Sequence, residues 1–490
     1  MIPPPTMEAT AHDPTPADET ALRVAIDRSV RWPVLVFFGH GFLWLMVALA
    51  AAFLANCRLA WPGGPGSVAA LSYPRLQPAH LAMLVYGWGC NMAFGTMLWL
   101  MARLCRREAK GAFTFIVAGA VWNLVVLAGV GSVLAGHGTG FEWLEFPRGA
   151  WPVMFASYAV IAGKLLVLFR CRPGQDCYIS LHYLVAALFA FPWLLLTAWV
   201  FLFAAPGAAV MSTAVNLWYV GGLQALFFTP VALAALSFLI PKVTGRAGPA
   251  SNLARAGFWG LVGVGAWTGM QPLVGGPLPA WMPVLSAAAC FVLVIPALVV
   301  FLDLRIALNG PPEGRGFGPT LRFAAAGLWA FLGVVVLGAL LAYGGRFVGF
   351  STALTGQAYA HLLGFFGMAV FAAVAFILPR VTGCEWPARE SLRTHFWFTV
   401  CGIGLLVAFS VAGGCQQGAA VADFQTGWRV VLEKFQPFVA GRLFALALLF
   451  VINLLFLRSF AVMLLGPGRP ADTDFLDNHP ASEPSAPTEA

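Results

Sequence analysis

Residues 281–302 read WMPVLSAAACFVLVIPALVVFL and contain no Asp, Glu, Lys, Arg or His. A run of about 20 apolar residues is long enough to cross the hydrocarbon core of a bilayer as an α-helix. A strand of an outer-membrane barrel needs only about 10 residues, and its apolar residues alternate with polar ones. This stretch therefore predicts a membrane-spanning helix.

The rest of the chain has the same character. Of its 490 residues, 60% are hydrophobic and 10% are charged, and the mean hydropathy is +0.81. An ordinary soluble protein is about 25% charged. So few charges cannot cover the surface of soluble domains of this total size. The composition excludes a soluble enzyme, a disordered chain and a fibrous protein.

Hydropathy predicts an all-α, polytopic membrane protein with twelve transmembrane helices. The predicted spans are 33–56, 78–101, 112–135, 150–169, 181–205, 214–240, 254–275, 281–302, 322–343, 355–378, 395–415 and 437–464. We expect one membrane domain over residues 31–466. A disordered or amphipathic N-terminal tail over 1–30 and a disordered acidic C-terminal tail over 467–490 flank it.

The distribution of basic residues predicts the orientation. Of the 28 lysines and arginines, 20 lie on the side of the two tails and seven on the opposite side, while Lys164 lies inside the fourth span. Cytoplasmic loops of membrane proteins carry the excess of Lys and Arg. Both termini are therefore expected in the cytoplasm. The net charge of +8 has the same explanation, and nothing indicates a nucleic-acid partner.

Two spans end in similar sequences. The sixth ends in FLIPKVTG at residues 238–245, and the tenth ends in FILPRVTG at 376–383. Pro, a cation and Gly suit a cytoplasmic helix end. The repeat indicates a duplicated structural unit. The nine cysteines form no Cys-x-x-Cys pair, and we expect no disulfide.

Three of the eight histidines lie at membrane depth: His40, His80 and His361. His80 lies in the first turn or two of the second span and His361 in the second turn of the tenth. Both helices are expected to start at the outer face, so both histidines lie toward that face. Two imidazoles at one depth on two helices suit a heme iron held between them. His40 has no partner at its depth and is expected to be a satisfied polar core residue. The other five, including His395, are expected to be solvated or interfacial.

The run from Tyr73 to Arg103 resembles the second helix of the heme-copper oxidase catalytic subunit, in its cbb-type branch. The resemblance covers residues 20–465 and implies that family's twelve-helix bundle. In the family, the histidine that matches His80 binds the low-spin heme. Further similar segments are 59–62, Pro173 with 178–180, 218–242, 258–281 and 395–418.

The positions that match the family's copper ligands carry other residues. The ligand of the sixth helix falls on Gly221, and the His pair of the seventh falls on Gln271 and Pro272. The redox tyrosine falls on Gly265. Since a copper ion needs ligand side chains, the resemblance implies that copper is not bound.

The tenth helix leaves two alignments open. In the family it carries His-x-His, the first for the high-spin heme and the second for the low-spin heme. Without gaps, these positions fall on Gln357 and Tyr359. A local two-residue shift instead places His361 on the low-spin ligand and Tyr359 on the high-spin ligand. The shifted alignment is favoured because it restores a bis-histidine site with His80. Tyr359 as a heme ligand would disfavour oxygen reduction, and a second heme is doubtful.

Two arginines, Arg75 and Arg442, lie near the outer helix ends. They suit either pairing with heme propionates or anchoring at the membrane interface. The favoured function is a heme protein with one low-spin heme b. It would transfer electrons or serve in a respiratory complex beside subunits such as a cytochrome c-type subunit, in a bacterial inner membrane. The alternatives are a heme-free structural or assembly subunit and an atypical terminal oxidase or nitric oxide reductase.

Overall fold

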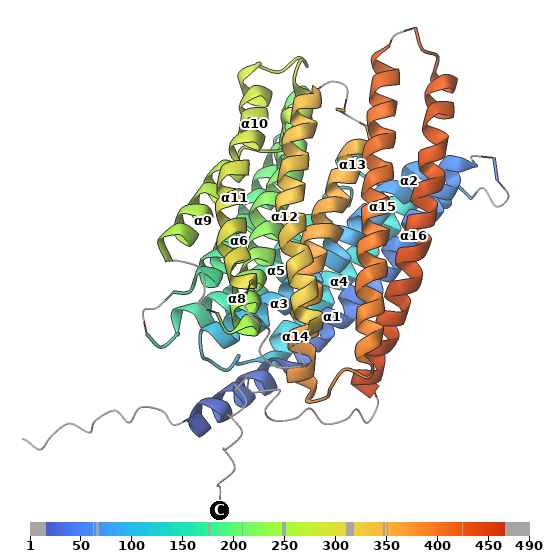
Figure 1. The fold of residues 1–490 in the computed structure, drawn as a ribbon. Helices are drawn as coiled ribbons and strands as arrows, with labels where there is room; N and C mark the ends of the chain where they lie inside the picture. The colour runs from blue at the N-terminus through green and yellow to red at the C-terminus, as the bar shows by residue number, and fades with distance from the viewer. Residues whose placement is uncertain are drawn as a thin grey trace, which may run out of the picture.

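The computed structural model describes residues 16–61, 63–64, 68–174, 177–207, 209–246, 251–309, 318–345, 348–349, 351–423 and 425–465. Within these ranges the regular structure is helical, and the helices form one upright bundle (Figure 1). α1 begins and α16 ends at the same end of the bundle, the lower end in Figure 1. Of the two predicted tails, residues 1–15 and 466–490 lie outside the described residues.

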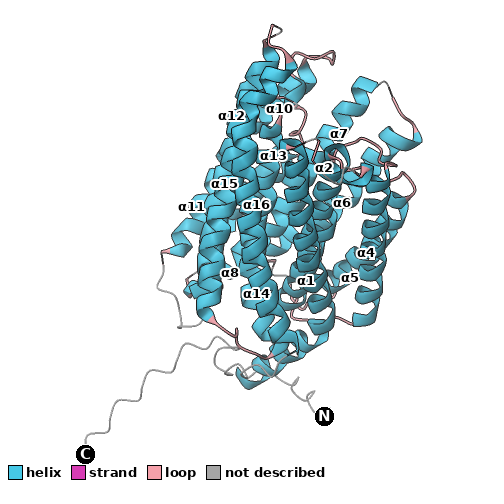
Figure 2. Cartoon of the chain, turned by 90° about the vertical axis from the view of Figure 1, so that its right-hand side faces the viewer, coloured by secondary structure: helices cyan, strands magenta, loops and turns pink. Residues whose placement is uncertain are grey.

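The α-helices in chain order are α1 (Pro16–Ala60), α2 (Tyr73–Ala82), α3 (Cys90–Leu104), α4 (Ala112–Ala135), α5 (Ala150–Arg170), α6 (Ile179–Trp199), α7 (Ala209–Leu223), α8 (Thr229–Thr244), α9 (Ser251–Gly265), α10 (Trp281–Val292), α11 (Val294–Leu308), α12 (Gly318–Gly344), α13 (Thr352–Tyr359), α14 (Gly367–Thr382), α15 (Arg389–Ala422) and α16 (Trp428–Leu465). Figure 2 shows the same bundle turned by 90°.

Three spans contain a π-helical segment between two α-helices. These segments are η2 (Met83–Gly89) between α2 and α3, η4 (Gln224–Phe228) between α7 and α8, and η7 (Ala360–Phe366) between α13 and α14. The three spans are the most buried, with 100%, 83% and 100% of their most apolar window inside the bundle. They therefore form its centre. π-Segments are rare in helices and are frequent at functional sites.

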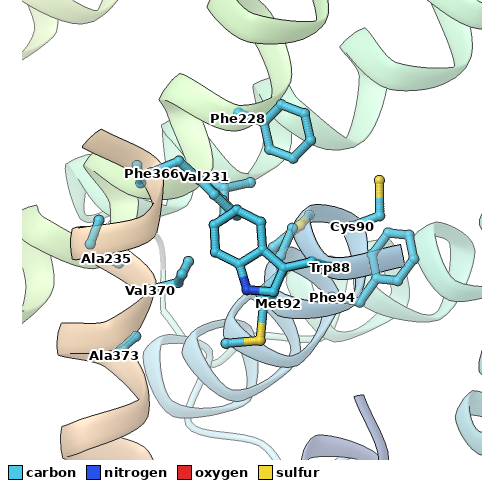
Figure 3. Packing of buried hydrophobic residues seen from close by; sticks show 14 of the residues in the cluster. Trp88, Cys90, Met92, Phe94, Phe228, Val231, Ala235, Phe366, Val370 and Ala373 are labelled. Atoms are coloured by element: carbon cyan, nitrogen blue, oxygen red, sulfur yellow. The ribbon is translucent and has the colours of Figure 1, made fainter. Parts of the chain in front are cut away.

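The side chains of these central spans interlock. Trp88 of η2 lies edge-on to Phe366 of η7, with ring centroids 5.6 Å apart, and Phe366 lies 4.9 Å from Phe228 of η4 (Figure 3). A Cβ added to Gly89 would lie 2.9 Å from the Phe228 ring. Small residues on one helix thus make room for aromatic rings of the next.

The structure has eleven described helices that are long and apolar enough to span a membrane, whereas the sequence predicts twelve. The difference lies in the span predicted at 254–275, because α9 ends at Gly265 and only a 3-10 turn at Gln271–Leu273 follows. Gly269 has a φ of +113°, and Pro272 has no backbone N–H to donate. These two residues break the helix, and an irregular segment completes this crossing.

The N-terminal boundary expected at residue 31 lies inside α1, which begins at Pro16. The part of the expected tail from residue 16 on is helical. Glu19 pairs with Arg23 and Arg106, and Asp27 pairs with Arg103 of α3. These ion pairs tie the first turns of α1 to the end of α3.

The repeated motif is a helix end in both copies, as the sequence predicts. α8 and α14 end at Gly245 and Gly383, whose φ values are +65° and +71°. This left-handed conformation favours glycine and terminates a helix. The two helices contact each other in the bundle centre.

Candidate functional site

The structure brings His80 of α2 together with Tyr359, the last residue of α13. The Nε2 atom of His80 lies 2.8 Å from the Tyr359 hydroxyl oxygen. Both side chains are 1% exposed. The His80 Nδ1 atom is buried, and the ring also interacts with the backbone of Leu76 and Gln77, one turn earlier in α2. Of the two alignments of the tenth span, this geometry matches the ungapped one, in which Tyr359 faces His80.

A buried cation without a carboxylate partner among the described residues lies beside this pair. Arg442 of α16 is 0% exposed, and its guanidinium interacts with the Tyr359 side chain. The guanidinium lies close enough to His80 and Tyr359 to interact electrostatically with both. Burying a charge without a partner costs several kcal/mol. The site is therefore suited to an anionic group that Arg442 can bind.

Arg75 has a different environment from Arg442. Its Nη1 donates a hydrogen bond to the Leu134 carbonyl oxygen at 3.0 Å, and the guanidinium packs against Gly136. Leu134 and Gly136 lie at the C-terminal end of α4, where carbonyl groups lack partners within the helix. Arg75 therefore caps α4.

His361 does not face His80. It lies in η7, where its Nε2 atom is 3.2 Å from the Thr229 hydroxyl of α8. It lines a separate cavity that also contacts Gly221, Gln271 and Pro272. The structure thus places Tyr359 and His361 on opposite sides of one helix. The favoured pairing of His361 with His80 differs from this arrangement.

At Gly221, one of the positions that match the family's copper ligands, backbone occupies the place of a side chain. A Cβ added to Gly221 would lie 2.6 Å from the Cα of Gly269. Gly269 itself is packed so closely that its Cβ would lie 2.4 Å from the Leu217 carbonyl oxygen. Gln271 accepts a hydrogen bond from the Gly269 N–H at 2.8 Å. The irregular segment that follows α9 therefore packs against α7 through Gly269. It leaves no space for a side chain at residue 221.

The remaining membrane histidines are structural. His40 bonds through Nδ1 to the Val36 carbonyl oxygen at 2.8 Å, so its polar atom is satisfied within α1. The prediction that His395 is solvated or interfacial is wrong, because it is 1% exposed. α15 begins at residue 389, so His395 lies within the helix and packs on Phe371 and Phe456.

A buried acid that was not predicted from the sequence lies in the segment between α4 and α5. Glu145 is 4% exposed, and its Oε1 accepts a hydrogen bond from the Trp143 N–H at 2.9 Å. Burial raises the pKa of Glu145 to about 8, and the nearby Glu142 adds to this rise. Trp143 has a φ of +60°, which is strained for a bulky residue. The signal was a glutamate in the aromatic run FEWLEF.

This segment is held by polar residues of the central spans. The Tyr86 hydroxyl donates to the Trp143 carbonyl oxygen and lies 2.8 Å from the Tyr219 hydroxyl. Asn216 accepts from the Glu142 N–H at 3.0 Å and donates to the Glu142 carbonyl oxygen at 2.8 Å. The backbone of Glu142 and Trp143 is therefore fixed to the second and sixth spans.

The fold and the site define an all-helical, multi-pass membrane protein with a buried histidine–tyrosine–arginine group at its centre. Residues 33–448 match the family described as "Cytochrome C and Quinol oxidase polypeptide I". The chain belongs to this family, the heme-copper oxidase subunit I superfamily.

Similar proteins agree with this assignment. The chain is 23% identical over 435 residues to a Rhodobacter capsulatus protein named cytochrome c oxidase subunit 1, covering 84% of this chain and 78% of the relative. It is 25% identical over 410 residues to a cytochrome c oxidase subunit 1 homolog of Azorhizobium caulinodans, covering 78% and 70%. A solved heme-copper terminal oxidase dimer shares the fold, with a TM-score of 0.68, 13% identity, and coverage of 92% of this chain and 86% of the other.

Proposed function

We propose that this protein binds one low-spin heme b and functions in electron transfer or as a subunit of a respiratory complex. It would not reduce oxygen itself. The observation that carries the proposal is the fully buried guanidinium of Arg442, which has no carboxylate partner among the described residues and lies beside the His80–Tyr359 pair. A heme carries propionate carboxylates, which would pair with this cation. When bound, heme supplies one-electron chemistry.

The donor set fits a heme iron. Imidazole and phenolate are both axial ligands of heme proteins, and His80 Nε2 points directly at the Tyr359 oxygen. Bonds from a transition metal to imidazole are about 2 Å long, so a metal between these atoms needs more than their present 2.8 Å separation. Heme binding would therefore require the side chains of His80 and Tyr359 to move apart. His80 would be the first residue to hold the heme iron and Tyr359 the second, and His361 would serve only if η7 shifted.

We further propose that the protein binds no copper. Gly221 and Pro272 have no ligand atom in their side chains, and the carbonyl oxygen of Gln271 is occupied by the Gly269 N–H and the Ser286 hydroxyl. The backbone around Gly269 occupies the space that a ligand at residue 221 would need. A redox tyrosine is missing at Gly265 as well.

The proposed setting is the inner membrane of a bacterium, with both termini in the cytoplasm and with other respiratory subunits, such as a cytochrome c-type subunit, as partners. The excess of basic residues on the side where α1 begins supports this orientation.

The test is a reduced-minus-oxidised spectrum of the purified protein, with pyridine hemochrome and copper analysis. We expect one heme b per chain and no copper. His80→Ala should abolish the heme spectrum, and His40→Ala, a control at a histidine satisfied by Val36, should leave it unchanged. An unchanged spectrum in His80→Ala would overturn the assignment.

A second candidate is a heme-free structural or assembly subunit. The observation that favours it is the filling of small-residue sites by aromatic side chains: Cβ atoms at Gly87 and Gly95 would lie 2.5 Å from Trp44 and 2.6 Å from Phe38. Absence of a Soret band after expression in heme-replete cells would select this candidate. Cyanide-sensitive consumption of oxygen or nitric oxide by the isolated subunit would instead indicate an atypical oxidase or reductase.

A further inference from the structure

The cavity beside His361 is separate from the His80 site and is built from neutral polar groups. The centre of a water-sized sphere can move through about 110 Å³ of this cavity, which leaves room for a small molecule. Three glutamines from three elements line it: Gln224 of η4, Gln271 of the broken span and Gln357 of α13.

The carboxamides hold unused hydrogen-bonding capacity. The side chains of Gln224 and Gln357 make no hydrogen bond to a described residue. The Gln271 oxygen already accepts from the Gly269 N–H at 2.8 Å and from the Ser286 hydroxyl at 3.1 Å. Only the NH₂ group of Gln271 remains, and it is a donor. This donor needs an acceptor such as a carbonyl oxygen.

The charge of the lining restricts the ligand further. Of the lining residues, only Glu142 carries a carboxyl group, and none is Lys or Arg. A charged ligand would have no opposite charge deep in this cavity, which is costly at membrane depth. The walls between the glutamines are apolar and include Leu217, Phe331 and Val334. They suit a hydrocarbon body.

We propose that this cavity binds an uncharged molecule with an apolar body and a carbonyl group, such as a neutral ketone or amide. The carboxamides of Gln224, Gln271 and Gln357 form its polar end, and Phe331 and Val334 contact its apolar part. The proposal does not depend on heme binding at His80, because the two sites lie on opposite sides of the tenth span.

Benzophenone tests the proposal, since it is a neutral diaryl ketone that crosslinks to nearby C–H groups under ultraviolet light. The purified full-length protein is irradiated with increasing benzophenone, and the labelled peptides are mapped. We expect saturable labelling within residues 217–229, 268–272, 331–338 or 354–361. Its charged analogue, 4-benzoylbenzoate, should label these residues at least tenfold less. Equal labelling by the two compounds would overturn the proposal.

Two glycines of α12 provide a matched pair of variants. A Cβ at Gly338 would lie 2.9 Å from the movable Gln357 amide, whereas nothing lies within 4 Å of a Cβ at Gly333. Gly338→Leu fills the cavity and should abolish saturable labelling, and Gly333→Leu should not. Labelling that persists in a folded Gly338→Leu protein would contradict the proposal.

Polar substitutions provide a second test that does not add volume. Gln224→Leu and Gln357→Leu remove the hydrogen-bonding groups at nearly constant size. Each should raise the benzophenone concentration that gives half-maximal labelling by tenfold or more. Unchanged half-saturation in both variants would reduce the site to an apolar cavity and overturn the proposal. Loss of cavity labelling on loading with hemin, with His361→Ala restoring it, would identify heme as the occupant instead.

Discussion

The Nε2 atom of His80 lies 2.8 Å from the hydroxyl oxygen of Tyr359, although 279 positions separate the two residues in the chain. The contact joins the second and the tenth spans at the point where each begins a π-segment. His361, only two residues beyond Tyr359, faces Thr229 and the neighbouring cavity. The tenth span therefore presents one candidate ligand to each of two separate sites.

Substitution of Tyr359 tests which residue faces His80. Tyr359→His should give a bis-histidine heme spectrum, because the new imidazole starts from the backbone position opposite His80. His361→Ala should leave heme content and spectrum unchanged. Optical and electron paramagnetic resonance spectra check both variants. Loss of the heme in His361→Ala alone would show that η7 shifts and that His361 is the second ligand.

Replacement of the Tyr359 hydroxyl tests the same contact in heme-free protein. Tyr359→Phe removes one buried hydrogen bond and leaves the His80 Nε2 atom without a partner. We expect a loss of about 1–3 kcal/mol in stability, as for other buried polar groups left unpaired. Thermal unfolding in detergent measures it. An unchanged melting temperature would show that water or another group satisfies His80.

Arg442 should have opposite effects with and without heme. Without heme, Arg442→Leu removes a buried charge that no described carboxylate balances, so the melting temperature should stay the same or rise. With heme, the same variant removes the partner of the propionates and should weaken heme retention by tenfold or more. Arg442→Lys keeps the charge and is the control. Destabilisation of the heme-free Leu variant would indicate that the guanidinium already has a partner.

Restoring a ligand at residue 221 should not restore copper binding. In Gly221→His, the new Cβ meets the Gly269 backbone at 2.6 Å, so we expect overpacking that costs about 1–3 kcal/mol and no bound copper. Gly263→His is the matched control, since nothing lies within 4 Å of a Cβ there. Metal analysis and thermal unfolding compare the two. Stoichiometric copper in Gly221→His would show that the broken span can move away.

Stability should fall as pH rises because of Glu145. Burial raises its pKa to about 8, whereas an unfolded glutamate titrates near 4.3. Between these values the unfolded state releases a proton that the folded state keeps. Stability therefore decreases by about 1.4 kcal/mol per pH unit at most, and the loss is complete above pH 8. In Glu145→Gln, the free energy of unfolding should depend less on pH between pH 5 and 8 than in the wild type. Substitution of the exposed Glu433 by Gln should leave the pH dependence unchanged.

The sequence alone determined the bundle and the candidate histidines. Apolar runs long enough to span a bilayer, such as 281–302, depend only on local composition, so eleven of the twelve predicted spans recur as long described helices. The exits at Gly245 and Gly383 were also predictable, because they depend on a local left-handed conformation. Membrane depth follows from position along a helix, which brought His80 and His361 into consideration.

Only the tertiary structure decided which residues face one another. The direction of a side chain depends on rotation about the helix, and the π-segments η2 and η7 change that rotation without a clear mark in the sequence. Tyr359 rather than His361 therefore faces His80. The close approach of Gly269 to Gly221 and the burial of Arg442 away from any described carboxylate also arise between distant segments. Such contacts depend on packing across the bundle, which no local pattern specifies.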